Sequence, residues 1–119
     1  MKLSDYVMQR VAEAGARHVF LVPGGGAMHL NDSLGRQPDL TFVANLHEQA
    51  SSVAAEAYAR VTGGLGVCMV TTGPGATNAI TGLTGAWLDS TPCLFLSGQV
   101  KRPDIKTGTG LRQLGNQEI

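Results

Sequence analysis

Residues 66–78 read GVCMVTTGPGATN, and this stretch decides the fold. Residues 66–72 are apolar on both faces, which is typical of a buried strand in a parallel sheet. Gly73-Pro74-Gly75 then forms a tight loop, and residues 76–88 follow with the spacing of a helix. A buried strand that passes through a glycine loop directly into a helix indicates a βα unit.

The same kind of unit extends to both sides of this stretch. The other elements that we expect are helices over 4–14, 27–34 and 46–62 and strands over 18–22, 40–44 and 92–97. Ser4 is the expected N-cap of the first helix, and Gly15 is its natural stop. The alternation of strands and helices predicts an α/β domain in which a parallel sheet is flanked by helices on both faces.

Two of the expected helices carry informative patterns. Along 46–62, apolar side chains recur at helical spacing as one stripe, which is typical of a core-facing surface. The stripe consists of Ala50, Val53, Ala54, Ala57, Tyr58 and Val61. Along 76–88, Gly82 and Gly85 each lower helix stability by about 1 kcal/mol relative to alanine. We therefore expect close packing against another backbone at these glycines.

Composition and charge exclude several classes of protein. The chain has 119 residues, 43% of them hydrophobic, which suits a single domain with a packed core. Nine basic and nine acidic side chains give a formal net charge of zero, which argues against a nucleic-acid partner. No apolar run approaches the roughly 18–20 residues that span a bilayer, and the N-terminus does not resemble a signal peptide. A cytoplasmic protein without membrane contact is the expectation.

The cysteines and histidines lie in patterns that favour structural roles. Cys68 and Cys93 each sit within an apolar run, where cysteine usually behaves as a small core residue. His18, His29 and His47 do not have the spacing of a metal site, and we expect no metal site in this chain.

Two glycine loops follow expected strands, at 24–26 and 73–75. Ligands of α/β sheets bind at the carboxyl ends of the strands, and such loops can present backbone N–H groups to a polar ligand. The loops are equally consistent with tight turns in which glycine relieves strain. The first loop begins like the dinucleotide fingerprint G-x-G-x-x-G, with His29 in place of the third glycine. A nucleotide-binding α/β module is therefore one alternative.

Glu48 is the most informative charged residue, because it follows the expected strand 40–44 at the start of the longest helix. One interpretation is a capping box, with Asn45 as the N-cap and Glu48 three residues later. The other interpretation is a functional carboxylate at the ligand-binding edge of the sheet.

Four ordered blocks of sequence bear on this choice. They are His47-Glu48-Gln49-Ala50, the residues AAEAYAR at 54–60, the residues TGPGATN at 72–78, and Gly98-Gln99-Val100. Their order and spacing resemble the N-terminal pyrimidine-binding domain of thiamine diphosphate-dependent enzymes of the acetolactate synthase type. The resemblance covers nearly the whole chain, from about Leu3 to Glu118. It implies that residues 1–119 are a truncated part of this domain, with the central and the C-terminal diphosphate-binding domains absent.

The resemblance also implies roles for individual residues. Glu48 would be catalytic, because the glutamate of this block hydrogen-bonds N1′ of the cofactor's aminopyrimidine and so activates the cofactor toward a 2-oxo acid. The residues that would contact the cofactor are Pro23, Gly24, Gly25, Glu48, Thr72, Gly73 and Asn78. Those that would lie in the substrate region are Gly26, Thr71, Gln99 and Gln117. The implied reaction is decarboxylation of a 2-oxo acid followed by carboligation.

Further partners follow from the resemblance alone. The family binds the cofactor's diphosphate through Mg²⁺ on a separate domain with a G-D-G motif, which this sequence lacks. That domain belongs to a second subunit, so the resemblance implies a homodimer or homotetramer and an isolated chain that is inactive. Whether FAD is also bound, and which 2-oxo acid and acceptor react, are left open. A non-catalytic descendant of the family is a further alternative.

Overall fold

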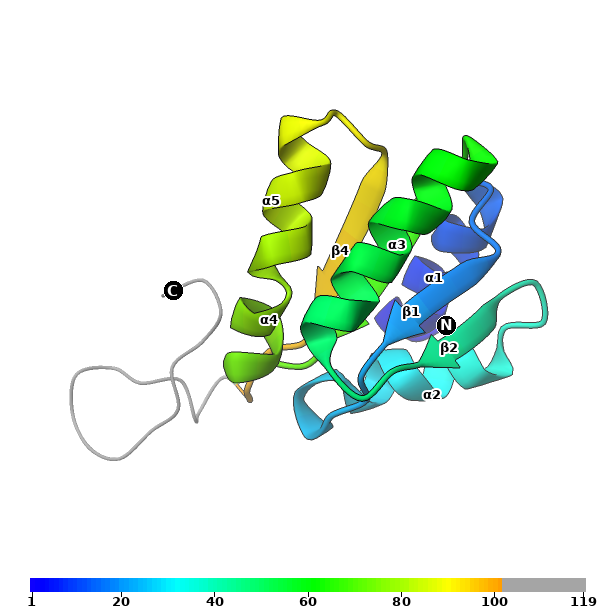
Figure 1. Cartoon of the computed structure of the whole chain (residues 1–119). Coiled ribbons are helices and arrows are strands. Elements are labelled where there is room, and N and C mark those ends of the chain that lie inside the picture. The colour runs from blue at the N-terminus through cyan, green and yellow to red at the C-terminus, as the bar shows by residue number, and fades with distance from the viewer. Residues whose placement is uncertain (102–119) are drawn as a thin grey trace.

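The computed structural model describes residues 1–101. They form a four-stranded, all-parallel sheet in the order β2-β1-β3-β4 (Figure 1). Its strands are β1 (His18–Leu21), β2 (Thr41–Ala44), β3 (Gly66–Val70) and β4 (Cys93–Ser97). The helices are α1 (Leu3–Glu13), α2 (Met28–Arg36), α3 (Glu48–Thr62), α4 (Pro74–Asn78) and α5 (Ile80–Leu88), and a 3-10 turn, η1 (Gly25–Ala27), precedes α2.

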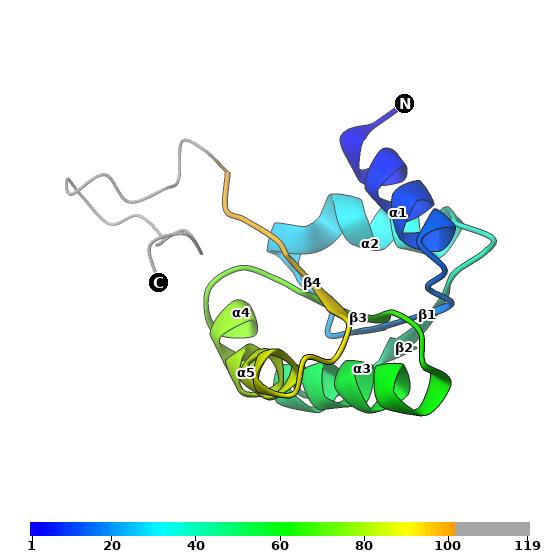
Figure 2. The ribbon, with the colours of Figure 1, turned by 90° about the horizontal axis from the view of Figure 1, so that it is seen from above.

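Helices cover both faces of the sheet, as predicted. Figure 2 shows α1 and α2 on one face and α3, α4 and α5 on the other. The core under α1 and α2 holds the large apolar side chains, namely Met8, Val11, Ala16, Val19, Leu21, Leu34, Leu40, Val67 and Met69. The core under α3 to α5 is built from smaller buried residues, namely Ala55, Cys68, Val70 and Ala79. No helix within residues 1–101 is long and apolar enough to cross a membrane.

The predicted core-facing stripe on α3 is wrong. Val53 and Val61 on that stripe are 46% and 87% exposed. The helix instead buries its small side chains, Ser51, Ser52, Ala55 and Ala59. Small side chains let the α3 backbone approach β3 and α5 more closely than valine or tyrosine would, so close packing decides which face is buried.

The predicted close packing at Gly82 is confirmed. A Cβ atom at Gly82 would lie 2.5 Å from Ser52 Cβ and 2.7 Å from the Ser52 carbonyl carbon. The α5 backbone therefore rests directly on α3. At Gly85, one turn later, a Cβ would meet only the end of the Glu56 side chain, at 3.2 Å.

Two further details of the predicted helices are wrong. The segment 76–88 is not one helix, because α4 ends at Asn78 and α5 begins at Ile80. Between them the Ala79 N–H bonds the Ala76 carbonyl, three residues back, which tightens the turn and restarts the helix. Ser4 is not the N-cap of α1 either, since the helix begins at Leu3 and Ser4 is buried.

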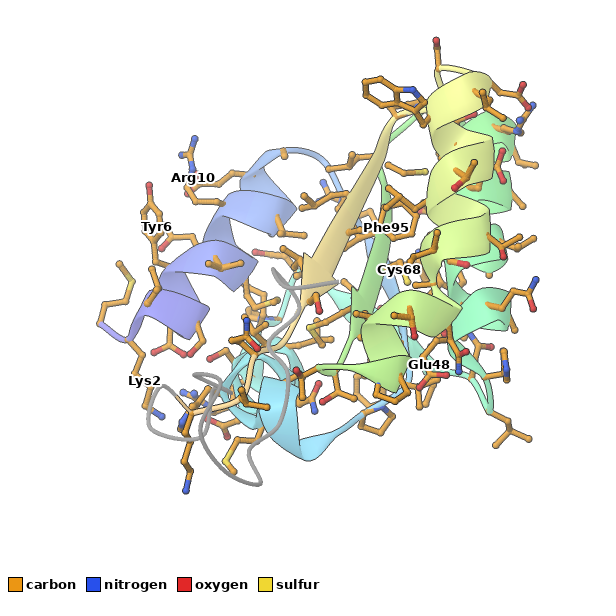
Figure 3. All side chains as sticks on the ribbon, turned by 90° about the vertical axis from the view of Figure 1, so that its left-hand side faces the viewer. Lys2, Tyr6, Arg10, Glu48, Cys68 and Phe95 are labelled. Carbon is orange, nitrogen blue, oxygen red and sulfur yellow. The ribbon has the colours of Figure 1, made fainter. Side chains whose placement is uncertain are left out.

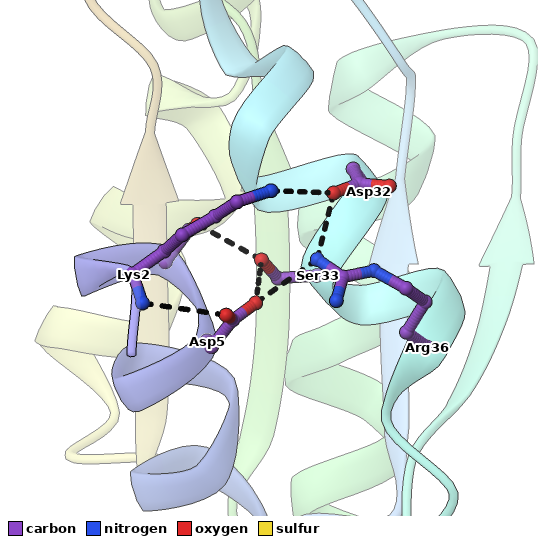
Figure 4. A network of polar contacts seen from close by, with 6 residues as sticks. Lys2, Asp5, Asp32, Ser33 and Arg36 are labelled. Atoms are coloured by element: carbon purple, nitrogen blue, oxygen red, sulfur yellow. Dashed lines mark hydrogen bonds and ion pairs between the residues drawn. The ribbon is translucent and has the colours of Figure 1, made fainter.

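Ser4 belongs to a polar network that joins α1 to α2 (Figure 4). The Ser33 hydroxyl lies 2.8 Å from the Ser4 hydroxyl and donates to Asp5 Oδ1 at 2.7 Å. Arg36 Nη2 bonds Asp5 Oδ1 at 3.0 Å and Asp32 Oδ2 at 2.7 Å. The Ser33 hydrogen bond first, then the Lys2 backbone N–H and the Arg36 charge, hold the pKa of Asp5 below its usual value.

Acid titration should reveal this network. A carboxyl whose folded-state pKa is lowered stabilises the fold above its unfolded pKa of about 3.8, and this contribution disappears as the pH falls through the folded value. Ser33→Ala removes the main cause of the lowered pKa. We expect the variant to lose less stability than the parent between pH 5 and about pH 2, measured by thermal unfolding. Parallel pH dependences would contradict the network.

Alanine substitutions at the two glycines of α5 should differ in their effect on stability. Gly82→Ala should lower the free energy of unfolding by about 1–3 kcal/mol, because overpacking against Ser52 exceeds the roughly 1 kcal/mol gained in helix propensity. Gly85→Ala is the matched control, which should be as stable as the parent or slightly more so. Denaturant unfolding measures both. If Gly82→Ala were as stable as Gly85→Ala, the close approach would be wrong.

Candidate active site

The candidate site lies at the carboxyl edge of the sheet, where the strand order reverses. The chain passes from β1 to β2 on one side of β1, whereas β3 pairs with β1 on the other side. Leu21 is in register with Ala44 of β2 and with Met69 of β3, so the three strands end at the same level. In open parallel sheets this switch point is where ligands bind.

Glu48 reaches this edge as the first residue of α3, and it does not cap the helix. The N-cap is His47, whose Nδ1 accepts a hydrogen bond from the Gln49 N–H at 3.1 Å. Asn45 instead donates through Nδ2 to Ser51 Oγ at 3.0 Å. The capping-box interpretation of Asn45 and Glu48 is therefore wrong, because the helix starts two residues later than expected.

A residue from α4 holds the Glu48 carboxylate. Asn78 Nδ2 donates to Glu48 Oε2 at 3.1 Å, across 30 positions of sequence. Within residues 1–101 no second side chain or backbone group is seen to hydrogen-bond this carboxylate. Figure 3 shows Glu48 beside α4, at the end of the molecule toward which the strands point. A negative charge in the first turn of α3 is also favoured by the helix dipole.

The loop after β1 is held in place by hydrogen bonds from three directions. The Gly26 N–H donates to Thr71 Oγ1 at 3.0 Å, and the Gln99 N–H donates to the Gly26 carbonyl at 3.2 Å. From α2, Asn31 Nδ2 lies 3.4 Å from the Gly24 carbonyl. The neighbouring Gly25 is exposed, and a Cβ there would meet no atom of residues 1–101 within 4 Å. The outer surface of this loop can therefore be approached closely.

The loop after β3 lies beside the first one. Gly73 has φ 61° and ψ −123°, a conformation that side chains other than glycine rarely adopt. Thr72 Oγ1 lies 3.4 Å from Gln99 Oε1, which also accepts the Val100 N–H at 2.9 Å. The end of β4 is thereby connected to the β3 loop.

The structure brings most of the predicted site residues to one edge. Three contacts link them directly: Glu48 with Asn78, Gly26 with Thr71, and Thr72 with Gln99. The remaining described members belong to the same two loops, namely Pro23, Gly24, Gly25 and Gly73. Gln117 lies outside the described residues.

The role of Asn31 and the capping role of His47 were not predicted from the sequence. Asn31 lies seven residues after Gly24, on the helix that follows the loop, and its Oδ1 is buried without a hydrogen-bond partner within the described part of the chain. His47 lay inside the expected helix 46–62, so its position offered no signal for a role as the N-cap. Asn31 supports the first loop and His47 caps α3, through contacts that spacing alone does not reveal.

The cysteines do not contribute reactive groups to this edge. Burial raises the pKa of the Cys68 thiol to about 12, so the thiol is protonated and poorly nucleophilic at neutral pH. This agrees with the expected core role of Cys68. Over residues 1–101, no cluster of three or more His, Cys, Asp or Glu side chains is arranged to hold a metal ion.

Comparison with known proteins points to one family. Residues 1–119 match the family model described as "Thiamine pyrophosphate enzyme, N-terminal TPP binding domain". The chain is 43% identical over 106 residues to the chloroplastic acetolactate synthase 2 of Zea mays, and 44% identical over 106 residues to that of Nicotiana tabacum. It is 42% identical over 104 residues to the acetolactate synthase large subunit of Porphyra purpurea.

These matches cover most of the chain and a small part of each relative. They include 89%, 89% and 85% of this chain but only 17%, 16% and 18% of the three relatives, in the same order. The chain therefore spans about a sixth of the length of these relatives.

Proposed function

Since the chain belongs to the thiamine pyrophosphate enzyme family, as its N-terminal TPP-binding domain, we propose that its carboxyl edge is the pyrimidine half of a thiamine diphosphate site. The main support is the position of Glu48. It is the first residue of α3, it does not serve as a cap, and Asn78 holds it at the switch point of the sheet.

The residues at this edge fit the aminopyrimidine ring of thiamine diphosphate. A ring nitrogen needs a carboxyl partner, and Glu48 supplies one. The flat ring needs backbone that can be approached closely, and among residues 1–101 no atom lies within 4 Å of a Cβ built on Gly25. Pro23, Gly24, Thr72 and Asn78 would complete the contacts with the ring.

Glu48 would hold a proton at the ring nitrogen N1′. Because Asn78 donates to Oε2, Oε1 is the oxygen that would meet the ring. Cofactor and a covering domain would remove water from Glu48, and a hydrogen bond in a site without water is stronger than one in water. Thiamine diphosphate, when bound, supplies the reactive carbon and the electron sink for 2-oxo acid chemistry.

We propose a 2-oxo acid as the substrate, with decarboxylation and carboligation as the reaction, because the relatives matched here are acetolactate synthases. Gly26, Thr71, Gln99 and Gln117 would line the substrate region. Mg²⁺ would be held with the diphosphate by a domain of a second subunit, within a homodimer or homotetramer. The chain alone would then be inactive, and a cytoplasmic location and the binding of FAD stay predictions.

The alternative of a nucleotide-binding module has less support. It requires a carboxylate at the end of the second strand to bind a ribose. Here β2 ends at Ala44, and Glu48 belongs to the following helix. A non-catalytic descendant of the family would show no turnover of a 2-oxo acid in the parent protein, so an activity assay of the parent decides between it and an enzyme.

Glu48→Gln tests the assignment in the full-length protein. Glutamine keeps the shape but cannot hold the proton, so we expect turnover of the 2-oxo acid to fall by about 10²–10⁴-fold. Thermal unfolding should change little. The matched control is Glu13→Gln, an exposed glutamate at the end of α1, which should retain full turnover. Unchanged turnover in Glu48→Gln would refute the assignment.

A further inference from the structure

Thr71 follows β3 directly, and its side chain fills the space between the two glycine loops. A Cβ built on Gly24 would lie 2.5 Å from Thr71 Cβ. A Cβ on Gly26 would lie 3.0 Å from Thr71 Oγ1, and one on Gly75 would lie 2.7 Å from Thr71 Cγ2. Glycine at positions 24 and 75 makes room for this threonine, and glycine at position 26 makes room for both Thr71 and Thr72, whose Cγ2 would lie 2.8 Å from a Cβ built there.

Polar contacts hold Thr71 in this place. Its Oγ1 accepts the Gly26 N–H at 3.0 Å, and its carbonyl accepts the Ser97 hydroxyl at 3.3 Å. The residue therefore joins the carboxyl ends of β1, β3 and β4. Its hydroxyl faces the first loop, and its methyl group faces Gly75.

Gly75 connects Thr71 to Glu48, because it lies next to both side chains. Gly75 is the second residue of α4, the helix that carries Asn78. A Cβ on Gly75 would lie 3.5 Å from Glu48 Oε1 as well as 2.7 Å from the Thr71 methyl. The start of α4 thus lies between Thr71 and the Glu48 carboxylate, while Asn78 at its end holds Oε2.

We propose that Thr71 is a positioning residue of the cofactor site. Its methyl group sets the distance between the first glycine loop and α4, and α4 in turn holds the Glu48 carboxylate through Asn78. This role rests on the proposed function, because it concerns the carboxylate that would meet the cofactor. Thr71 would act by positioning the neighbouring backbone and would not contact the reacting atoms.

The role can be tested by adding a methyl group at Gly75 and removing the methyl group of Thr71, singly and together. Gly75→Ala adds a methyl that overlaps Thr71 Cγ2, whereas Thr71→Ser removes Cγ2 and keeps the hydroxyl. With Cγ2 gone, the nearest Thr71 atom to the new methyl is Cβ, at 3.7 Å, an ordinary contact. Gly75 has no positive φ, so alanine is compatible with its backbone. The double variant therefore restores the original number of side-chain carbon atoms between the first glycine loop and α4.

The first measurement is the dissociation constant of thiamine diphosphate with Mg²⁺ in the full-length protein. Gly75→Ala should weaken binding by about tenfold or more, in the range of coupling between contacting residues. Thr71→Ser should weaken it by a smaller factor, and the double variant should return to within about threefold of the parent. Ser33→Ala, on the α1–α2 side, is the control, which should lose stability without losing affinity.

Crystal structures of the same variants are the second measurement. The Asn78–Glu48 hydrogen bond should be lost or lengthened in Gly75→Ala and restored in the double variant. A double variant that binds worse than both single variants, or that does not restore this bond, would overturn the positioning role. If the parent itself does not bind thiamine diphosphate, the proposed function fails, and the crystal structures still decide whether Thr71 positions Glu48.

Discussion

Close packing around the central strand β3 governs the rest of the structure. All five residues of β3 are buried, and α3 lies against it with serine and alanine side chains. Because these side chains are small, backbones approach closely, and α5 can rest on Ser52 only through Gly82. Most of the large side chains that are fully buried lie on the opposite face, under α1 and α2, while Phe20 and Phe95 are only partly buried on the α3 side. The two layers thus hold three strand ends at one level, which is the geometry that the candidate site requires.

At the carboxyl edge of the sheet, the contacts that pack the loops also position the candidate site residues. Thr71 fits between Gly24, Gly26 and Gly75, so the glycines that look like a phosphate-binding signature serve first to seat a side chain. The loops that result present backbone at one end of the sheet, and Asn78 fastens Glu48 beside them. Within residues 1–101 the Glu48 carboxylate accepts one amide and does not cap its helix, so it has capacity for a further partner. This is why the geometry suits a cofactor ring better than it suits a simple helix start.

The sequence predicted the order of elements and the parallel sheet well, because buried strands and glycine stops are strong local signals. The sequence predicted the wrong buried face of α3. Apolar periodicity favoured large side chains such as Val53 and Val61, whereas the close approach of the backbones buries Ser52 and Ala55. The sequence also failed at Asn45, because a capping box depends on where the helix begins, which was two residues later. The contact of Thr71 with two loops could not be predicted, because it joins residues 45 positions apart.

The most direct test of the central claim is calorimetric titration of thiamine diphosphate into the full-length protein, with and without Mg²⁺. The protein must first be shown to be folded and free of cofactor. If residues 1–101 form the pyrimidine half of the site, binding should be saturable and should depend on Mg²⁺. A folded, cofactor-free protein that gives no heat of binding at any temperature tested would contradict the account. The carboxyl edge would then be a tightly packed end of a sheet without a cofactor.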